Sequence, residues 1–259
     1  MFLVCSELII GDLILHPYGL LIAFGIIVGM SLCLWLAPKH NMSRDVVVDL
    51  LLCMVAGGLV GAKSLAIIVN LKNILNGAMT FLQALSVTVV YGGIIGALLA
   101  CAVYCKIKKV DFWGYSDLCL SCVAITQGIG RLGCLMAGCC YGIEYSGFGA
   151  ITFTNSPFAP NNTPLFPSQI VSSLFMLIFG IILLVWCSKH KHNPGDIGTT
   201  YILVYGLARS FIENYRGDLE RGFILGMSTS QFISIFFVAL GFGIKLWKYQ
   251  QREQEKENL

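Results

Sequence analysis

Charged residues are scarce in this chain: Asp, Glu, Lys and Arg make up 12% of its 259 residues, about half the share in soluble domains. Hydrophobic residues make up 56%, and a further 28 residues are glycine. This balance argues against a soluble globular domain and against a disordered tail, because both carry far more polar surface. The formal net charge of +3 argues against a basic nucleic-acid module. The composition predicts an all-α protein that crosses a membrane several times.

The sequence also lacks the marks of a disulfide framework, a cleaved signal peptide and a second domain. Its 11 cysteines are odd in number, and most lie in apolar runs, where cysteine packs as a small hydrophobic residue. The N-terminus has Glu7 and Asp12 where a signal peptide carries positive charge. We expect residues 1–259 to form a single transmembrane domain, with an outer loop at about 138–167 and a short cytoplasmic tail from about 249.

Seven apolar stretches are long enough to cross a bilayer, which takes about 17–25 residues. They lie near residues 18–37, 46–70, 84–105, 112–137, 168–187, 197–215 and 226–248. The connections on one side of these stretches, together with the C-terminal tail, hold eleven Lys and Arg residues, and the other side holds three. Because cytoplasmic loops are enriched in Lys and Arg, we expect the N-terminus outside and the C-terminus in the cytoplasm.

Three cations fall inside the expected spans: Lys63, Arg131 and Arg209. A charge near the bilayer centre costs about 2.5–3.5 kcal/mol, so such residues usually have a function. At about 1.5 Å per residue, all three and Tyr91 lie roughly 9–11 Å below the outer surface. We therefore expect an anionic ligand at this depth. In the outer leaflet the abundant anion is phospholipid phosphate, which the planar fork of arginine binds in a bidentate way.

The sixth span carries a polar stripe with a spacing of three or four residues. Its members are Tyr201, Tyr205, Arg209, Glu213 and Arg216. Residues at this spacing share one helix face, which must line the helix bundle or a water-filled cavity rather than lipid. The alternative is that Arg209 and Glu213 only neutralise each other.

Glycines cluster at the same depth, in Gly57–Gly61, Tyr91–Gly96 and Gly128–Gly133. Close helix packing between small residues explains some of them. For Tyr91-Gly92-Gly93 we favour a broken or re-entrant helix, because adjacent glycines can expose backbone N–H groups to a lipid head group.

Six short motifs occur in a fixed order along the chain. They are Tyr18-Gly19, Gly61-Ala62-Lys63, Tyr91 to Gly96, Gly130-Arg131-Leu132-Gly133 through Gly142, Pro167-Ser168-Gln169, and Tyr205 to Arg216. Their order resembles that of the prolipoprotein diacylglyceryl transferase family over about residues 16–235. The resemblance implies seven transmembrane helices in the bacterial cytoplasmic (inner) membrane, with the site toward the outer leaflet.

The resemblance also implies a reaction. The diacylglyceryl group of phosphatidylglycerol moves to the thiol of the lipobox cysteine in a lipoprotein precursor, and glycerol-1-phosphate leaves. Arg131, Arg209, Tyr91 and Glu213 are the candidate catalytic residues. The candidate substrate-binding residues are Tyr18, Lys63, Gly92, Gly93, Gly96, Gly142, Ser168, Gln169, Tyr205 and Arg216. We expect no metal, no cofactor and no nucleic-acid partner.

This chain departs from the family pattern where the family handles protons. Tyr91 stands where the family has histidine, and a phenol is a poor base at neutral pH. Cys134, Cys139 and Cys140 lie where the family has two amides and a carboxylate. Their spacing matches no zinc template, and two adjacent residues of a helix do not easily bind one ion. We favour packing or an outer-face disulfide for them over a metal or redox site.

These departures leave alternatives open. In the first alternative, another group, His16 or Glu213, activates the acceptor thiol. In the second, the chain is a paralogue with a different acceptor. A non-catalytic protein that binds or transports phospholipid is a further alternative. Transport would need a second polar site on the cytoplasmic side, where only Asp49 and Asp117 lie. The last alternative is a structural membrane subunit in which charges between helices hold the helices together.

Overall fold

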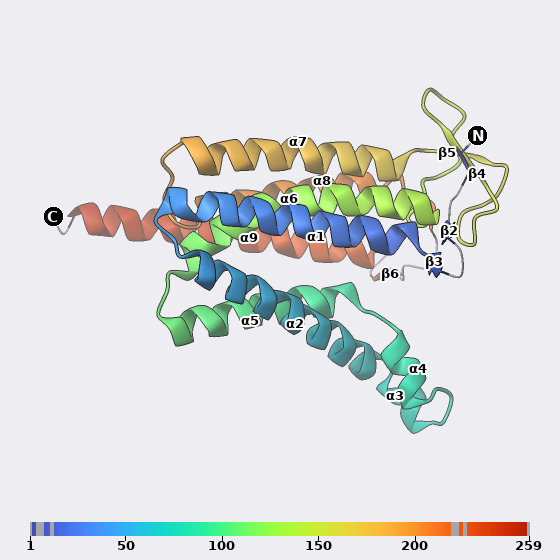
Figure 1. The fold of residues 1–259 in the computed structure, drawn as a ribbon, viewed down its shortest axis with the longest axis horizontal. Helices are drawn as coiled ribbons and strands as arrows, with labels where there is room; N and C mark the ends of the chain where they lie inside the picture. The colour runs from blue at the N-terminus through green and yellow to red at the C-terminus, as the bar shows by residue number, and fades with distance from the viewer. Residues whose placement is uncertain (1, 4–7, 11–12, 219–222, 225–226, 258–259) are drawn as a thin grey trace. The chain divides into compact units, whose positions relative to one another are not determined.

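The structure of the chain is a computed structural model (Figure 1). It describes residues 2–3, 8–10, 13–218, 223–224 and 227–257. Glu7 and Asp12, on which the expectation of no signal peptide rests, lie outside the described residues, as do the last two residues of the tail. The chain forms two compact units. The first unit combines residues 1–32 with 116–259, and the second unit comprises residues 33–115.

Long helices account for most of both units. Those of the first unit are most of α1 (Pro17–Leu36) and α6 (Phe112–Ala137), with α7 (Ser168–Lys189), α8 (Asp196–Glu213) and α9 (Thr229–Glu257). The second unit contains a 3-10 helix, η1 (Ala37–His40), followed by α2 (Arg44–Val69), α3 (Leu71–Leu75), α4 (Phe81–Ser86) and α5 (Val90–Lys108). The expected all-α architecture is therefore confirmed in its coarse form.

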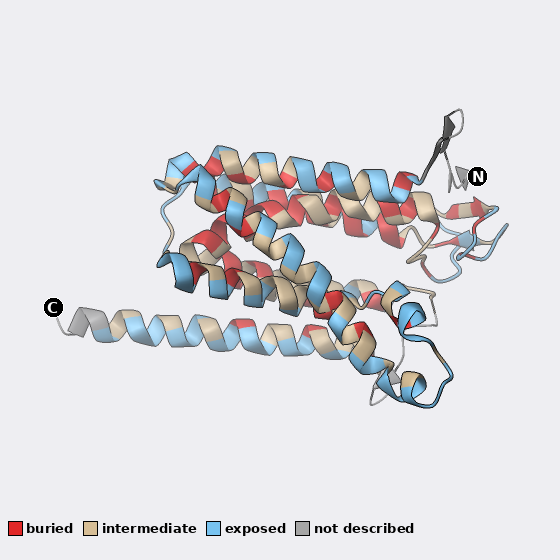
Figure 2. Ribbon diagram, turned by 60° about the horizontal axis from the view of Figure 1, so that its bottom comes forward, coloured by how far each residue is buried: buried red, intermediate tan, exposed pale blue. Residues whose placement is uncertain are grey.

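Six helical stretches of the described chain are long and apolar enough to cross a membrane. They are Pro17–His40, Arg44–Val69, Val90–Lys108, Phe112–Ala137, Ser168–Lys189 and Thr229–Gln254. Their outward faces carry large apolar side chains that are more than half exposed, such as Val60 and Phe236 (Figure 2). A soluble protein rarely leaves such continuous apolar faces open. The chain is therefore a multi-pass membrane protein. The seventh long helix, α8, is less apolar because it includes Asp196, Arg209 and Glu213.

Glycines let the helices of the first unit approach closely. A Cβ atom on Gly128 of α6 would lie 2.7 Å from Leu177 of α7, and one on Gly206 of α8 would lie 3.1 Å from the carbonyl oxygen of Ser234 on α9. The hydroxyl of Ser173 on α7 donates to the carbonyl oxygen of Gly128 at 2.8 Å. These contacts join α6 to α7 and α8 to α9, and the hydrogen bond from the Tyr201 hydroxyl to Gln127 joins α8 to α6.

The segment between α6 and α7 is an ordered loop with a small sheet. Strand β4 (Ile151–Thr154) pairs in parallel with β1 (Phe2–Leu3) and antiparallel with β5 (Pro164–Leu165). Phe153 and Leu165 are 1% exposed and pack with Leu135 at the end of α6. The segment expected to form a loop at 138–167 thus has a small apolar core, which fixes it to the end of α6.

Two short pairs of strands complete the described structure. Strand β2 (Leu8–Ile10) pairs antiparallel with β3 (Leu13–Leu15), directly before α1. Strand β6 (Phe223–Ile224) pairs antiparallel with β7 (Met227–Ser228), directly before α9.

A buried carboxylate fixes the start of α8. Asp117 of α6 is 1% exposed, and its two oxygens accept hydrogen bonds from the backbone N–H groups of Gly195 and Gly198, both at 2.7 Å. A negative charge at a helix N-terminus is also favoured by the helix dipole. His192 lies 3.7 Å from the same carboxylate. These partners assign Asp117 a structural role.

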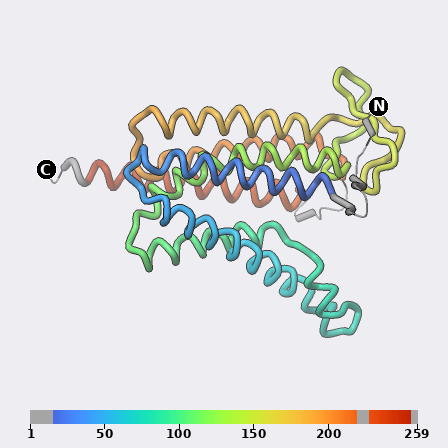
Figure 3. Tube along the Cα trace, viewed as in Figure 1, coloured from blue at the N-terminus to red at the C-terminus, as the bar shows by residue number. Residues whose placement is uncertain are grey.

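In the second unit, α2 and α5 form an antiparallel hairpin (Figure 3). A Cβ atom on Gly96 would lie 2.2 Å from the carbonyl oxygen of Gly57, and one on Gly92 would lie 2.4 Å from that of Gly61. The expected helix break at Tyr91-Gly92-Gly93 is wrong in its position. The backbone leaves the helical form at residues 87–89, between α4 and α5, and the glycines lie inside α5, where they allow the two backbones to touch.

This packing predicts that Gly96→Leu disrupts the hairpin. The first carbon of the new side chain would already overlap the Gly57 carbonyl, and overpacking typically costs about 1–3 kcal/mol. The apparent midpoint of thermal unfolding in detergent is expected to fall by several degrees. Gly243→Leu on α9 is the matched control, because a Cβ atom there meets nothing within 4 Å. Equal midpoints for the two variants would contradict the packing role.

Candidate functional site

An ion cluster lies at the C-terminal end of α8. The Glu213 side chain is 1% exposed, and its Oε2 lies 3.0 Å from Nη2 of Arg209 and 3.8 Å from Nη1 of Arg216. Its Oε1 accepts a hydrogen bond from the Ser228 hydroxyl at 3.0 Å. One buried carboxylate therefore holds two guanidinium groups in fixed positions. Two members of the expected stripe, Arg209 and Glu213, lie on α8, whereas Arg216 lies beyond its end.

Arg216 is held from a second side by Asp218. Its Nε and Nη2 donate to the two oxygens of that carboxylate at 3.1 and 2.6 Å, which is the bidentate arrangement. Its backbone forms a β-bridge with Gly142 of the loop after α6. A Cβ atom on Gly142 would lie 2.3 Å from the carbonyl oxygen of Phe166, so only glycine fits there. Arg216 and Gly142 thus tie the end of α8 to the loop.

Arg131 lies on α6 and faces the same region. It lines a small pocket with Tyr205 and Arg209 of α8 and with Ser172, Phe175 and Met176 of α7. The pocket has a volume of ≈ 20 Å³, enough for about one water molecule. Among the described residues no carboxylate forms an ion pair with Arg131, whose electrostatic neighbours are Cys134, Cys140 and Tyr205. Within the described chain, three guanidinium groups thus face two carboxylates here, which leaves one positive charge.

Aromatic residues border the cluster. The rings of Tyr201 and Tyr205 stack at 5.7 Å, and the buried Tyr201 hydroxyl donates to Gln127 of α6 at 2.8 Å. Tyr18, at the start of α1, is 43% exposed, and its carbonyl oxygen lies 3.2 Å from where Gly133 of α6 would carry a Cβ atom. Tyr18 and Tyr205 therefore lie at the edges of the region that Arg131 occupies.

The cysteines predicted to pack on a helix lie mostly outside one. Helix α6 ends at Ala137, and Gly138 and Cys140 both adopt positive φ angles of 71° and 56°. This tight turn brings the sulfur atoms of Cys134, Cys139 and Cys140 within 4.8 Å of one another. The premise that the adjacent pair shares a helix is therefore wrong. The turn follows from a helix end capped by glycine.

Ser168 and Gln169, at the start of α7, hold this turn in place. The Ser168 hydroxyl donates to the carbonyl oxygen of Cys140 at 2.7 Å, and the Gln169 amide donates to that of Cys139 at 2.9 Å. Both side chains are buried. These two residues, predicted to bind substrate, therefore position the cysteine loop.

The surroundings of the turn shift the pKa values of the two neighbouring thiols in opposite directions. Hydrogen bonds from Cys134 and Cys139, with the positive charges of Arg216 and Arg131, lower the pKa of the Cys140 thiol well below its usual range. Hydrogen bonding to Cys134 and Cys140 raises the pKa of the Cys139 thiol. A thiolate at Cys140 is thus favoured by its surroundings, because the thiolate is the form that cations stabilise.

The remaining predicted site residues belong to the second unit. The ammonium group of Lys63 on α2 donates to the Thr88 hydroxyl at 3.0 Å and to the carbonyl oxygen of Val87 at 3.3 Å. Tyr91 and Gly93 begin α5 just after this segment, and both are half-buried. Gly92 and Gly96 pack against α2 as described above. Lys63 is therefore brought close to the start of the helix that carries Tyr91.

Sequence reasoning missed three partners of the site. They are Asp218, which binds Arg216, and Ser228 and Ser230, which contact Glu213 and Arg209 and follow the segment that connects α8 to α9. Helix periodicity cannot find residues beyond a helix end. The candidate base His16 is exposed, and its carbonyl oxygen accepts from Leu20 at 3.2 Å to begin α1.

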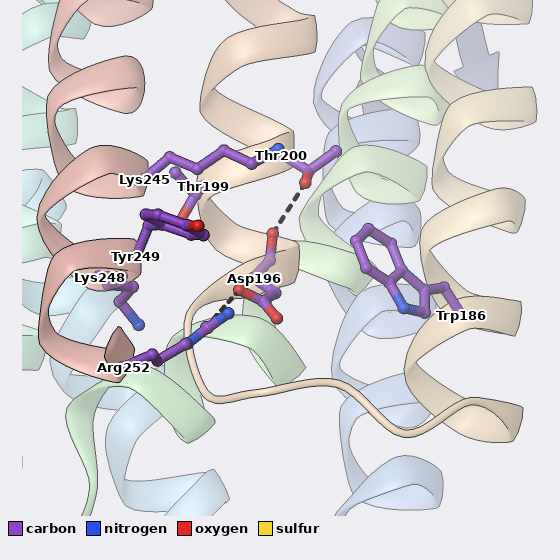
Figure 4. Close-up of a pocket in the computed structure, with 8 residues that line it drawn as sticks. All are labelled: Trp186, Asp196, Thr199, Thr200, Lys245, Lys248, Tyr249 and Arg252. Carbon is purple, nitrogen blue, oxygen red and sulfur yellow. Dashed lines mark hydrogen bonds and ion pairs between the residues drawn. The ribbon is translucent and has the colours of Figure 1, made fainter. Parts of the chain in front are cut away.

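A second pocket lies at the opposite end of α8 (Figure 4). It has a volume of ≈ 250 Å³, and its lining includes Lys245, Lys248 and Arg252 of α9. Arg252 contacts Asp196 at 2.7 Å, and the ammonium group of Lys248 donates to the carbonyl oxygen of Pro194. None of the predicted site residues lies in this pocket. Its cations are among the basic residues from which the sequence predicts a cytoplasmic end.

Comparison with known proteins identifies relatives along nearly the whole chain. Residues 7–247 match the family model described as prolipoprotein diacylglyceryl transferase. A phosphatidylglycerol–prolipoprotein diacylglyceryl transferase of Clostridium tetani is 38% identical over 227 residues, which cover 88% of this chain and 90% of the relative. The second such transferase of Clostridium perfringens is 36% identical over 245 residues, 94% of each chain. The chain therefore belongs to the prolipoprotein diacylglyceryl transferase family.

Proposed function

We propose that this protein transfers the diacylglyceryl group of phosphatidylglycerol to the cysteine thiol of a lipoprotein precursor. The names of its relatives specify both the lipid and the prolipoprotein. The acceptor sulfur forms a bond to the glyceryl carbon, and the bond from that carbon to the phosphate oxygen breaks. The electron pair stays on the oxygen, the thiol proton passes to solvent or to the phosphate, and glycerol-1-phosphate leaves.

The observation that carries this proposal is the position of Arg131. It lines the same pocket as Arg209, and no carboxylate of the described chain forms an ion pair with it. The departing phosphate gains negative charge in the transition state, so a preorganised guanidinium group stabilises it more than it stabilises the intact diester. We assign Arg131 to the phosphate of the lipid.

Arg209, Glu213 and Arg216 then form the frame around that phosphate. Glu213 accepts ion pairs from both arginines, which fixes their orientation. A carboxylate occupied in this way serves as a positioning residue rather than as the group that activates the thiol. The roles of Tyr18, Tyr205 and Gly142 in substrate binding, and the action of Lys63 and Tyr91 on the same head group, stay predictions.

The finer membrane placement is part of the same proposal. We place all seven long helices across the bacterial cytoplasmic membrane as one domain, with the N-terminus outside and the cysteine loop toward the outer leaflet. The excess of Lys and Arg in the opposite connections supports this orientation. A reporter enzyme fused after Leu259 is expected to be active only in the cytoplasm, and activity outside the cell would reverse the assignment.

Phospholipid transport is less well supported than transfer. Transport needs a polar site toward the cytoplasmic side, and both carboxylates that the sequence offers there have structural partners. Asp117 caps α8, and Asp49 of α2 accepts a hydrogen bond from the hydroxyl of Tyr104 on α5 at 2.9 Å.

A transfer assay tests the proposed function. Purified protein is incubated with phosphatidylglycerol labelled in its acyl chains and with a lipobox peptide, and the label on the peptide is measured. The expected result is labelled peptide, and no label on a peptide whose cysteine is replaced by serine. Label on neither peptide, from protein that still binds phosphatidylglycerol, would overturn the acceptor assignment.

A further inference from the structure

The three cysteines at the end of α6 form a preorganised set of soft ligands. Their sulfur atoms lie within 4.8 Å of one another. Zn–S bonds of about 2.3 Å place two sulfur ligands of a tetrahedral ion about 3.8 Å apart. The three thiols therefore need only small side-chain movements to bind one ion. Each is half-buried, so an ion and a further ligand can reach them.

The backbone of this cluster is fixed independently of any ion. Cys139 and Cys140 have their carbonyl oxygens held by Gln169 and Ser168, and the N–H of Cys139 donates to the carbonyl oxygen of Cys134 at 3.1 Å. Cys140 also keeps a left-handed backbone, which is uncommon for a residue other than glycine. Such buried supports orient ligands before they bind, as the outer-shell contacts of metal sites do.

The charge around the cluster suits a metal thiolate. Three thiolates and one Zn²⁺ carry a net charge of −1, and the guanidinium groups of Arg131 and Arg216 are electrostatic neighbours of Cys140. A disulfide would join two of the three sulfur atoms, and the third cysteine would remain a thiol. Three converging thiols beside two cations fit a thiophilic cation better than they fit a disulfide.

We propose that Cys134, Cys139 and Cys140 bind a Zn²⁺ ion and leave its fourth position open for the thiol of the acceptor peptide. Metal coordination deprotonates a bound thiol, and the thiolate is the nucleophile. This step supplies the activation that Tyr91 is poorly suited to provide. The proton released on coordination passes to solvent, and the sulfur then bonds to the glyceryl carbon as phosphate leaves. The role of the open position rests on the proposed transfer reaction, whereas binding of the ion does not.

Co²⁺ serves as the spectroscopic probe, because thiolate ligands give it intense charge-transfer absorption. Reduced, metal-free full-length protein in detergent is titrated with Co²⁺, without lipid or peptide. We expect one Co²⁺ per chain with thiolate charge transfer, and its displacement by Zn²⁺. Cys139→Ser is expected to weaken binding by at least about 10–100-fold, the loss that outer-shell changes alone produce. Cys53→Ser, which removes a half-buried thiol from α2, is expected to bind Co²⁺ as the wild type does.

The second step adds the lipobox peptide to the cobalt-loaded protein. The ligand-field bands of Co²⁺ are expected to shift with the cysteine peptide and to stay unchanged with the serine peptide. The proposal is overturned if Co²⁺ binds to Cys139→Ser as tightly as to the wild type. It is overturned as well if the ligand-field bands do not shift when the cysteine peptide is added. It is also overturned if two of the three cysteines resist alkylation in unreduced protein from which metal has been removed by a chelator, which would reveal a disulfide. Since no lipid is present, these outcomes do not depend on whether transfer occurs.

Discussion

Replacing Arg131 by lysine is expected to lower the rate of diacylglyceryl transfer by about 10²–10³-fold, the loss that follows removal of one preorganised donor to a developing oxyanion. The positive charge is kept in this variant. What is lost is the planar fork that binds two phosphate oxygens at once. In the pocket of ≈ 20 Å³ that Arg131 shares with Arg209, a flexible ammonium group cannot restore that geometry.

The measurement is the initial rate of peptide labelling at saturating lipid and peptide. Arg252→Lys is the matched control, because Arg252 contacts Asp196 at 2.7 Å in the second pocket, at the opposite end of α8. It is expected to transfer at the wild-type rate. A wild-type rate for Arg131→Lys would show that charge alone suffices and would remove the bidentate contact to phosphate that we assign to this guanidinium group.

The second large effect concerns stability. Glu213→Gln leaves Arg209 and Arg216 close together without the carboxylate that lies between them. Removing one partner of a buried ion pair typically costs about 3–5 kcal/mol. For a chain of this size, that loss lowers the thermal midpoint by about 6–20 °C. The transfer rate is expected to fall as well, because both arginines lose their fixed orientation.

Thermal unfolding in detergent micelles checks this prediction, with loss of helical circular dichroism as the signal. Glu144→Gln is the control, because Glu144 is exposed in the loop after α6 and substitutions there usually change stability by less than about 0.5 kcal/mol. If the two variants unfold at the same temperature, the ion cluster does not hold the end of α8.

Helix periodicity and the lengths of the apolar stretches predicted which residues share a helix face and about where the long helices lie. Tyr201, Tyr205, Arg209 and Glu213 share one face of α8, since residues four apart share a face of any regular helix. Arg216, the last member of the expected stripe, lies beyond the end of α8 and reaches Glu213 from there. Most long helices begin and end near the limits of the apolar stretches, because bilayer thickness and helix rise fix their length. Two do not: the stretch expected at 84–105 forms a helix only from Val90, and α9 continues past 248 to Glu257.

Contacts beyond helix ends escaped the sequence. The glycines of α5 predicted a break there, yet they serve the approach of α2, which depends on a partner helix distant in sequence. The cysteine turn depends on the end of α6 at Ala137 and on Ser168 and Gln169, which bond to residues 28 and 30 positions earlier in the chain. A local sequence pattern does not show which distant residues come into contact, so the convergence of three thiols could be found only from the structure.

In the proposed reaction, phosphate leaves as the peptide thiol is alkylated. The most direct test is to measure both products of one reaction, the lipidated peptide by mass spectrometry and glycerol-1-phosphate in the aqueous phase. We expect equal amounts of the two products at every time point, and neither product with the serine peptide. Lipidated peptide without glycerol-1-phosphate would mean that a different bond of the lipid breaks, and would contradict the assignment of Arg131 to a leaving phosphate.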